Sequence, residues 1–482
     1  MDQTTEAGAT TVATRLMECA LSRTGEHFDA SVLQRAKMCL LDFLSCAFEA
    51  LRQPWSEQAA ALAGSLHTDG ARTGGAQTGP AHTGGAHIIG WAGRYASGDA
   101  AFANAVAGHG LVREDMHAGS VTHLGVVVWP TVLALAETHR VSGRTLLVAA
   151  IVGYETGAQI GRAVITESLA RLFRPTGLIG PFAAVAAGAR IAGLDVPTAV
   201  HAFGLAGNCC AGLNQWPHTG ASDMYFHPGF AVRNALTCLS LARQGATGSS
   251  SILEGEAGFF AAYARTPLQK APTLFQGDRP EIMSVFNKAV PACNFAQSPC
   301  QAALIVAKQL AGRAVASIRV ETTAAAVAYP GCNASGPFDR ALQAKMSIAF
   351  GVAATLARGE VAEANYAALH DAEITRLISV TTLVADEAYT AAFPARQGAR
   401  VTVVLDDGTR LSSALDDVVP ADDALIRARF RAAACAVLGQ SAASRIEDFV
   451  SDLEHAPDAG ELACLCALPD PSGDNTLGRT PS

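Results

Sequence analysis

Alanine and glycine are spread over several faces of the long apolar segments of this chain, and this pattern limits its fold most strongly. Two segments have the apolar spacing of helices: RTLLVAAIVGYETGAQIGRAV, which begins at Arg144, and GPFAAVAAGARIAGL, which begins at Gly180. Small side chains let helix backbones approach closely, so we expect a buried bundle rather than a helical layer on a sheet. Charged residues form only 16% of the 482 residues, which fits a large close-packed core.

The apolar runs are too short to cross a membrane. Leu146–Val152 is followed by Gly-Tyr-Glu and Leu178–Ala189 ends at Arg190, well before the roughly 20 residues that a spanning helix needs. The first ten residues, MDQTTEAGAT, lack the basic and apolar regions of a signal peptide, so we expect a cytoplasmic protein. A net charge of −8 without a cluster of lysine or arginine argues against nucleic acid as a partner.

The twelve cysteines show no spacing typical of a cofactor site. Cys209 and Cys210 are adjacent, Cys464 and Cys466 are separated by one residue, and C-x-x-C does not occur. We interpret them as buried thiols of the core, with no zinc ribbon or local iron–sulfur motif. The sequence therefore predicts neither a metal nor a cofactor.

Helical periodicity covers residues 11–65 and 100–265, with one interruption between them. The near-repeat GARTG, GAQTG, PAHTG, GAH is too rich in glycine for an ordered helix or strand, so we expect a flexible surface insertion at 69–87. A phosphate-binding loop is disfavoured because the lysine and spacing of a P-loop are absent. Together, residues 1–267 are predicted to form the first part of a helical domain.

After about Thr266 the pattern changes to alternation with period two. This alternation predicts strands in SIRVETTAAAVAY, LISVTTLV and ARVTVVLDDGTRLSSAL. Asp406-Asp407-Gly408 predicts a hairpin turn. A helical stretch, RALQAKMSIAFGVAATLARG, lies between them. We expect a mainly α protein: a smaller α+β domain at 268–412, helices at 413–469 that return to the first domain, and a disordered tail at 470–482.

Histidines are concentrated in GHGLVREDMHAGSVTHLGVVVWP, which its glycines mark as a loop between helices. The polar side chains of this loop are His109, Arg113, Glu114, Asp115, His117 and His123. Three interpretations remain open. The spacing of Asp115, His117 and His123 permits a metal site, the histidines suit a proton-transfer and anion-binding loop, and the segment also fits a polar cap between helices.

Three further segments carry candidate residues. Tyr225 and His227 lie in NQWPHTGASDMYFHPGF, which we interpret as a polar loop, although either side chain also fits a core position. Lys288, in the irregular segment NKAVPACN, is either a carboxylate ligand or a solvated charge. Arg174 precedes Pro175 at a predicted helix start, where arginine and free amides together suit an anion.

The chain resembles the MmgE/PrpD family, which includes 2-methylcitrate dehydratase, cis-aconitate decarboxylase and iminodisuccinate epimerase. The resemblance is carried in order by AAFANAVAGHGLVREDMHAGSVTHLGVVVWPTVLALAE, VSGRTLLVAAIVGYE, FRPTGLIGPFAAVAAGARIAGL, FHPGFAVRNALTCLSLARQGATGSSSILEGEAGFF, NKAVPACNFAQSP and QAKMSIAFGVAATL. It implies a large helical domain formed by both chain ends, a smaller α+β domain, a site between them and a homodimer.

The resemblance also suggests roles for individual positions. The Asp-Asp-Thr-His-like segment of the family matches 114–117, its following Thr-His matches 122–123, and its K-x-x-P lysine matches Lys288. Three positions depart from the family pattern: Arg174 replaces a histidine of some members, Met224 a lysine and Phe350 a tyrosine. These departures speak against assuming 2-methylcitrate dehydratase or cis-aconitate decarboxylase activity, and leave chemistry on small polycarboxylates.

We therefore expect an enzyme that abstracts a proton alpha to a carboxylate of a small di- or tricarboxylate, most simply a hydro-lyase. An epimerase or racemase, a decarboxylase and a non-catalytic carboxylate-binding homologue are the alternatives. The expected carboxylate ligands are Arg113, Arg174 and Lys288, and His227 lines the pocket. The expected proton carriers are His117, His123 and Tyr225, with Asp115 fixing a histidine tautomer.

Overall fold

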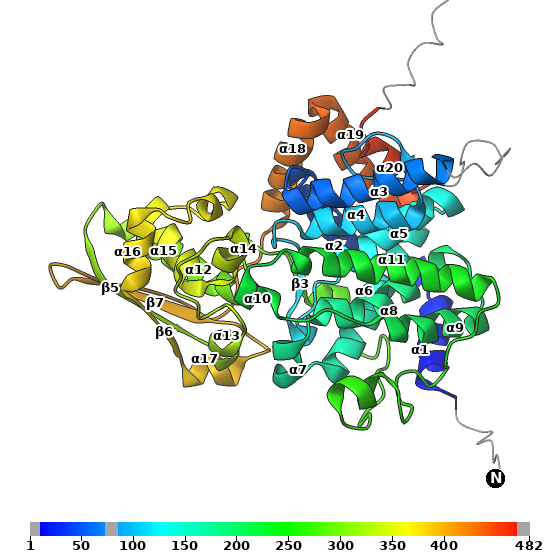
Figure 1. The fold of residues 1–482 in the computed structure, drawn as a ribbon, viewed down its shortest axis with the longest axis horizontal. Helices are drawn as coiled ribbons and strands as arrows, with labels where there is room; N and C mark the ends of the chain where they lie inside the picture. Colours follow the sequence, from blue (N-terminus) through cyan, green and yellow to red (C-terminus); the bar gives the residue numbers. More distant parts are fainter. Residues whose placement is uncertain (1–9, 73–84, 470–482) are drawn as a thin grey trace, which may run out of the picture.

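The computed structural model describes residues 10–72 and 85–469, which form a mainly helical body joined to a smaller part built on a sheet (Figure 1). The expectation of a mainly α fold is confirmed. The helices of the first part are α1 Val12–Ser22, α2 Ala30–Glu49, α3 Pro54–Arg72, α4 Ser97–His109, α5 Gly125–His139, α6 Gly143–Val164, α7 Glu167–Leu172, α8 Pro175–Ile191, α9 Val196–Ala206, α10 Trp216–Thr219 and α11 Asp223–Arg243.

Small residues bring helices α5, α6 and α8 into close contact, as their sequences predict. A Cβ at Gly157 of α6 would lie 3.0 Å from the Cβ of Ala183 on α8 and 2.4 Å from Leu124 Cδ2, just before α5. Gly153 is similarly placed, 2.9 Å from Val128 Cγ2. A larger side chain at these positions would push the backbones apart, so the small residues determine how tightly this core closes.

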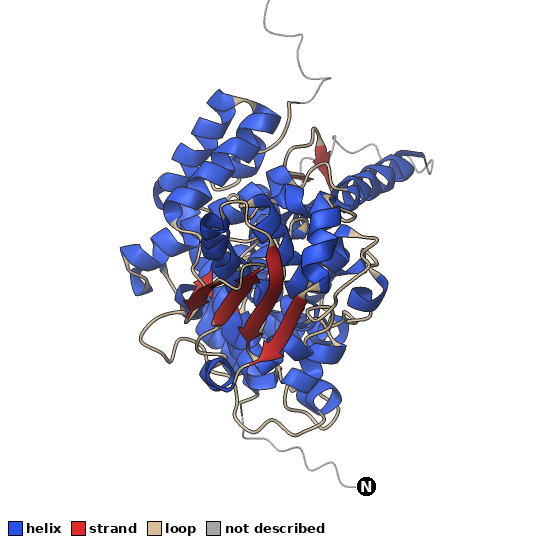
Figure 2. Cartoon of the chain, turned by 90° about the vertical axis from the view of Figure 1, so that its left-hand side faces the viewer, coloured by secondary structure: helices blue, strands red, loops and turns tan. Residues whose placement is uncertain are grey.

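The smaller part contains a four-stranded sheet with the strand order β6-β5-β7-β8 (Figure 2). Its strands are β5 Val315–Thr322, β6 Thr381–Ala385, β7 Ala399–Leu405 and β8 Arg410–Leu415. β5 is parallel to β6, and the other pairs are antiparallel. The predicted hairpin turn joins β7 to β8, where Gly408 has a φ of +82°. The helices here are α12 Gln297–Leu310, α13 Ala324–Ala328, α14 Ala341–Met346, α15 Ile348–Arg358, α16 Ala372–Ser379 and α17 Glu387–Ala392.

The last helices return to the first part of the chain. α18 Asp423–Leu438, α19 Gln440–Ser451 and α20 Glu461–Leu465 lie beside the N-terminal helices (Figure 1). Phe430 of α18 packs against Phe48 of α2, with ring centroids 6.2 Å apart. Ile282 and Val285 share this helical core, beyond residue 267, where the sequence suggested a change of domain. Val285 belongs to β4 Val285–Phe286, which pairs with β3 Met116–His117.

Two expectations about irregular segments need correction. The segment expected to be flexible from residue 69 begins as the end of α3, which runs to Arg72, and ends in β1 Ala86–His87, which pairs with β2 Arg94–Tyr95. Its middle, 73–84, lies outside the described residues, as does the tail 470–482. Tyr225 and His227 lie on helix α11 rather than in a loop.

Two findings concern the composition. None of the described helices has the length and apolar character to span a bilayer. All twelve cysteines are free and most are buried, which agrees with their interpretation as core residues.

Candidate functional site

A buried chain of polar side chains lies where the loop between α4 and α5 meets the start of α8. His109, the last residue of α4, donates from Nδ1 to Glu114 Oε1 at 2.7 Å. Its Nε2 accepts a hydrogen bond from Nη2 of Arg174 at 3.1 Å. Arg174 is the N-cap of α8, as the Arg-Pro sequence predicts, and its backbone amide donates to Gly212 O. His109 thus connects a carboxylate to a guanidinium and fixes the orientation of both.

His123 adjoins this chain through the same carboxylate. Its Nδ1 lies 2.9 Å from the carbonyl oxygen of Asp115 and 3.1 Å from Oε1 of Glu114. A carbonyl oxygen only accepts hydrogen bonds, so this contact assigns the proton to Nδ1 and leaves the lone pair on Nε2. Such a histidine is oriented as a base, and its backbone amide is held by Thr176 Oγ1 at 3.1 Å.

Burial decides the charge of the site histidines. Burial lowers the pKa of His109, and it lowers that of His123 well below 6.5, with the charge of Lys288 adding to the effect on His123. Burial also opposes ionisation of Glu114, but His109, Lys288 and His123 outweigh it and hold the pKa of that carboxyl well below its usual value. At neutral pH the site therefore contains neutral imidazoles and an ionised Glu114.

Lys288 is fully buried in the segment between β4 and α12. Its Nζ donates to Val112 O at 2.8 Å, and burial lowers its pKa while Glu114 raises it. Arg429 of α18 holds the backbone of this segment by donating to Lys288 O at 2.9 Å and to Ala289 O at 2.6 Å. The C-terminal helices thus position the lysine that the sequence singled out.

Tyr225 and His227 face the same region from α11. The Tyr225 ring stacks on Trp55 at 3.7 Å and lies 6.2 Å from the His109 ring, edge to face. Burial raises the pKa of Tyr225 well above 10, so its hydroxyl stays protonated. Burial, then the charge of Arg174, lowers the pKa of His227 to about 3.

Buried polar atoms of this region have no hydrogen-bond partner among the described residues. They are Tyr225 Oη, His227 Nδ1, Arg174 Nε and Glu114 Oε2. An unpaired buried polar group is costly, and such groups are retained where a ligand completes them. These atoms come from α11, α8 and the α4–α5 loop, so they mark one site between elements.

The side chains of three sequence candidates, Asp115, His117 and Arg113, bind partners outside this cluster. The carboxylate of Asp115 accepts from Gly125 N at 3.0 Å and from the Tyr154 hydroxyl, so its backbone carbonyl, rather than its carboxylate, orients His123. His117 bonds to Ser120 Oγ and, at 2.9 Å, to Glu281 Oε2. The structure therefore does not bring Asp115, His117 and His123 together as metal ligands.

Arg113 pairs with Glu49 at 2.6 Å and lines a cavity of about 760 Å³ together with Arg429 and Glu363. A second cavity of about 760 Å³ lies between the two parts of the molecule, with Arg171, His218 and Tyr329 in its wall. Burial raises the pKa of the Tyr329 hydroxyl, and the charge of Arg174 opposes this effect.

His109 and Glu114 lie in the histidine-rich loop but are not among the catalytic and substrate-binding residues that the sequence predicts. The positions that depart from the family pattern are buried: Met224 is fully covered, and Phe350 packs against Phe338 and Tyr366. A buried lysine that the sequence did not single out, Lys345, donates to Leu111 O at 2.8 Å and pairs with Glu363. Lys345 and Lys288 thus hold consecutive carbonyls of the loop.

Two cations, three neutral imidazoles and a protonated phenol thus lie in one buried region, and their chemistry suits binding of an anion and movement of protons. Comparison with known proteins gives the family. The MmgE/PrpD N-terminal domain matches residues 14–270 and the MmgE/PrpD C-terminal domain matches residues 290–455. The chain belongs to the MmgE/PrpD family.

Similar proteins of known name cover nearly the whole chain. Cis-aconitate decarboxylase-like protein oryM of Aspergillus oryzae is 29% identical over 472 residues, which span 90% of this chain and 93% of that protein. Cis-aconitate decarboxylase of Aspergillus terreus is 24% identical over 95% of this chain and 96% of its own length. The human cis-aconitate decarboxylase is 28% identical over a shorter region, 36% of this chain and 37% of that protein.

Proposed function

We propose that this protein is a lyase that acts on a small di- or tricarboxylate by proton transfer. The observation that carries the proposal is His123, whose Nε2 is left as a free base beside the buried cations Lys288 and Arg174. Removing a proton next to a carboxylate builds negative charge on that carboxylate, and nearby cations stabilise this charge in the transition state.

Each residue of the cluster has a role in such a reaction. Arg174 binds a substrate carboxylate with the face of its guanidinium that His109 leaves free, and Lys288 supplies a second positive charge. In a dehydration or an epimerisation His123 Nε2 accepts the substrate proton, and the Tyr225 hydroxyl, which is protonated before the reaction, donates one. Glu114 keeps the proton of His123 on Nδ1 and offsets the two cations.

Within this class we place decarboxylation before the dehydration that the sequence analysis put first, because the relatives that span 90% of the chain or more carry cis-aconitate decarboxylase names. In that reaction the bond to one carboxyl carbon breaks and carbon dioxide leaves. The electron pair passes into the neighbouring unsaturated carboxylate, which the cations hold, and the carbon at the far end of that double bond takes a proton from Tyr225. Decarboxylation removes no proton from the substrate, so in this reaction His123 Nε2 takes up a proton from solvent and returns it to the Tyr225 phenolate.

A panel of unsaturated, hydroxy and amino di- and tricarboxylates, followed by NMR in D₂O, tests the proposal. Release of carbon dioxide with one deuterium in the product supports decarboxylation. New vinyl signals without carbon dioxide indicate dehydration, and deuterium incorporation with inversion indicates epimerisation. Tight binding without any of these changes refutes a catalytic role. The His123→Gln variant serves as the control, because it should bind the substrate but lose turnover.

A further inference from the structure

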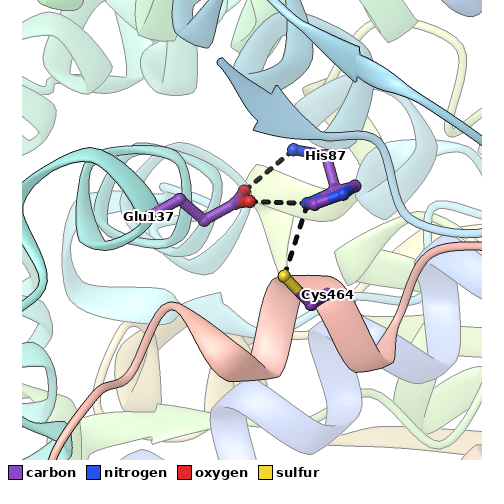
Figure 3. Close-up of side chains that lie close together, drawn as sticks. All are labelled: His87, Glu137 and Cys464. Carbon is purple, nitrogen blue, oxygen red and sulfur yellow. Dashed lines mark hydrogen bonds and ion pairs between the residues drawn. The ribbon is translucent and has the colours of Figure 1, made fainter. Parts of the chain in front are cut away.

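Three side chains that suit a transition metal lie close together in the helical part, and none of them belongs to the histidine cluster (Figure 3). They are His87 of β1, Glu137 near the end of α5 and Cys464 of α20. The ligand atoms of all three lie within 4.8 Å of one another. His87 and Cys464 are 377 positions apart in the sequence, so no local motif announces this group.

Backbone contacts hold the segments that carry His87 and Cys464, and the carboxylate of Glu137 accepts from the His87 amide at 2.8 Å. Asn104 Nδ2 donates to His87 O at 3.0 Å, and its Oδ1 accepts from Ile89 N at 2.9 Å. Gly90 N donates to Cys466 O at 2.8 Å, which ties α20 to the strand that carries His87. Ligands fixed in this way lose little freedom when they bind an ion, which favours binding.

The ligand atoms all lie within 4.8 Å of one another, and movements of the Glu137 side chain bring them to the spacing of a tetrahedral zinc site. Zinc bonds of about 2.3 Å to sulfur and about 2.05 Å to nitrogen or oxygen separate neighbouring ligand atoms by about 3.4–3.6 Å. His87 Nδ1 lies 3.8 Å from Cys464 Sγ, which is close to this value. It lies 2.6 Å from Glu137 Oε2 in a hydrogen bond, so that pair must open by about 0.8 Å when the ion replaces the shared proton.

The charges of the group are those that a zinc ion requires. A thiolate, a carboxylate and a neutral imidazole together balance a divalent cation, and the mixture of sulfur, nitrogen and oxygen ligands suits Zn²⁺. Arg94 Nη2 now lies 3.5 Å from Glu137 Oε2 and also bonds to Gly85 O. The carbonyl contact lets the guanidinium stay in place while Glu137 turns toward the ion.

We propose that His87, Glu137 and Cys464 bind one Zn²⁺ that fastens the C-terminal helix α20 to β1 and α5. Cys464 is exposed, so the ion enters from solvent and a water molecule takes the fourth position. The site is distinct from the histidine cluster, and its role is to stabilise the fold. The zinc proposal is therefore tested independently of the proposed lyase reaction.

Zinc binding to the full-length protein, freed of metal with a chelator, tests this inference. Titration should give one Zn²⁺ per chain and a melting temperature that rises with zinc concentration. Co²⁺ in place of zinc should give a thiolate-to-metal charge-transfer band. Cys464→Ser should abolish the band and weaken zinc binding at least tenfold, and His87→Gln should also weaken it.

Cys435→Ser is the matched control, because it makes the same change at another free and partly exposed cysteine, on α18. It should leave the band and the zinc affinity unchanged. Because Cys464 is exposed, its serine variant is expected to fold even if the His87 variant does not. A wild-type protein that binds no zinc, or an equal cobalt band in the wild type and Cys464→Ser, overturns the proposal.

Discussion

Replacing Glu114 by glutamine removes the negative charge between the two site histidines but keeps the shape of the side chain. Glu114 Oε1 lies 2.7 Å from His109 Nδ1 and 3.1 Å from His123 Nδ1. A hydrogen bond to a charged group contributes about 1.5–3 kcal/mol and a neutral one about 0.5–1.5 kcal/mol, so the exchange costs about 1–1.5 kcal/mol at each histidine. The sum of about 2–3 kcal/mol predicts a loss of about 30- to 160-fold in kcat/KM.

The same exchange should change the pH dependence. Burial lowers the pKa of Lys288, and Glu114 raises it. Without the carboxylate this pKa falls further, so Lys288 loses its proton at lower pH and the alkaline decline of kcat/KM moves to lower pH. The assay is the pH profile of kcat/KM for the best substrate of the NMR panel.

Glu454→Gln is the matched control for Glu114→Gln. It removes the carboxylate partner of Lys37, 2.9 Å away on α2, where neither group takes part in the proposed reaction. The control should lower the free energy of unfolding without changing kcat/KM. The reasoning is refuted if Glu114→Gln retains kcat/KM within threefold of the wild type with an unchanged alkaline limb.

Other predictions follow from the surroundings of the loop. Tyr154→Phe leaves Asp115 without its hydroxyl donor and the Trp129 indole without its acceptor at 3.0 Å, so urea unfolding should show a loss of about 2–4 kcal/mol; a loss below about 1 kcal/mol would contradict this network. His123→Gln should lower kcat at least about a hundredfold, or about 2.7 kcal/mol. His117→Gln breaks the bond to Glu281, so it should lower the melting temperature and change kcat less than about fivefold. Equal losses in kcat would be evidence against His123 as the proton carrier. Because burial lowers the pKa of His123 well below 6.5, wild-type kcat/KM should fall on the acid side only below pH 6.5, and an acid limb centred above that value would exclude His123 as the base. Burial raises the pKa of Asp115 from 3.8 to about 7, so between these pH values the folded state keeps a proton that the unfolded state releases. The free energy of unfolding contributed by Asp115 should therefore be present near pH 4 and lost toward pH 7. In unfolding curves measured across that range, Asp115→Asn should remove this pH dependence.

Structural features that depend on residues close together in the sequence can be predicted from the sequence. The helices of the bundle, the β7–β8 hairpin and the start of α8 after Arg174 follow from periodicity and from glycine and proline at their ends. Residue type in irregular or punctuated segments indicates Lys288, His123, Tyr225 and Arg174 as candidates. All four are buried in one region of the structure, and their roles stay predictions. The homodimer and the cytoplasmic location stay predictions.

The prediction of a loop at 214–230 is wrong because Pro228 and Gly229 do not end the helix. In the structure Pro228 and Gly229 lie inside α11. Gly229 faces Phe102 of α4, whose Cδ2 would lie 2.8 Å from an added Cβ. The glycine is there for close packing between helices, and a single sequence does not distinguish this role from a turn.

The roles of His109 and Glu114 were beyond sequence reasoning for a different reason. The loop predicted a set of polar side chains, but their partners lie elsewhere: Arg174 is 65 positions from His109, and Glu281 is 164 positions from His117. Which histidine joins the cluster depends on where these distant partners fall. The spacing of Asp115, His117 and His123 suggested a shared site, yet β3 directs His117 toward Glu281 instead.

The small residues that determine the packing also set the chemistry of the site. Gly157 brings α6 against Leu124, the residue after His123, and Gly161 brings the same helix within 2.4 Å of Ser120 Cβ, measured from an added Cβ. The loop is thereby enclosed by helices, and burial is the main cause of the lowered pKa of both His109 and His123. A histidine in water would be partly protonated near neutral pH, whereas this enclosure keeps Nε2 of His123 free to accept a proton. The same enclosure makes an isolated charge costly, so Lys288 and Arg174 require the negative charge of Glu114, and in the proposed reaction a substrate carboxylate would add a second one.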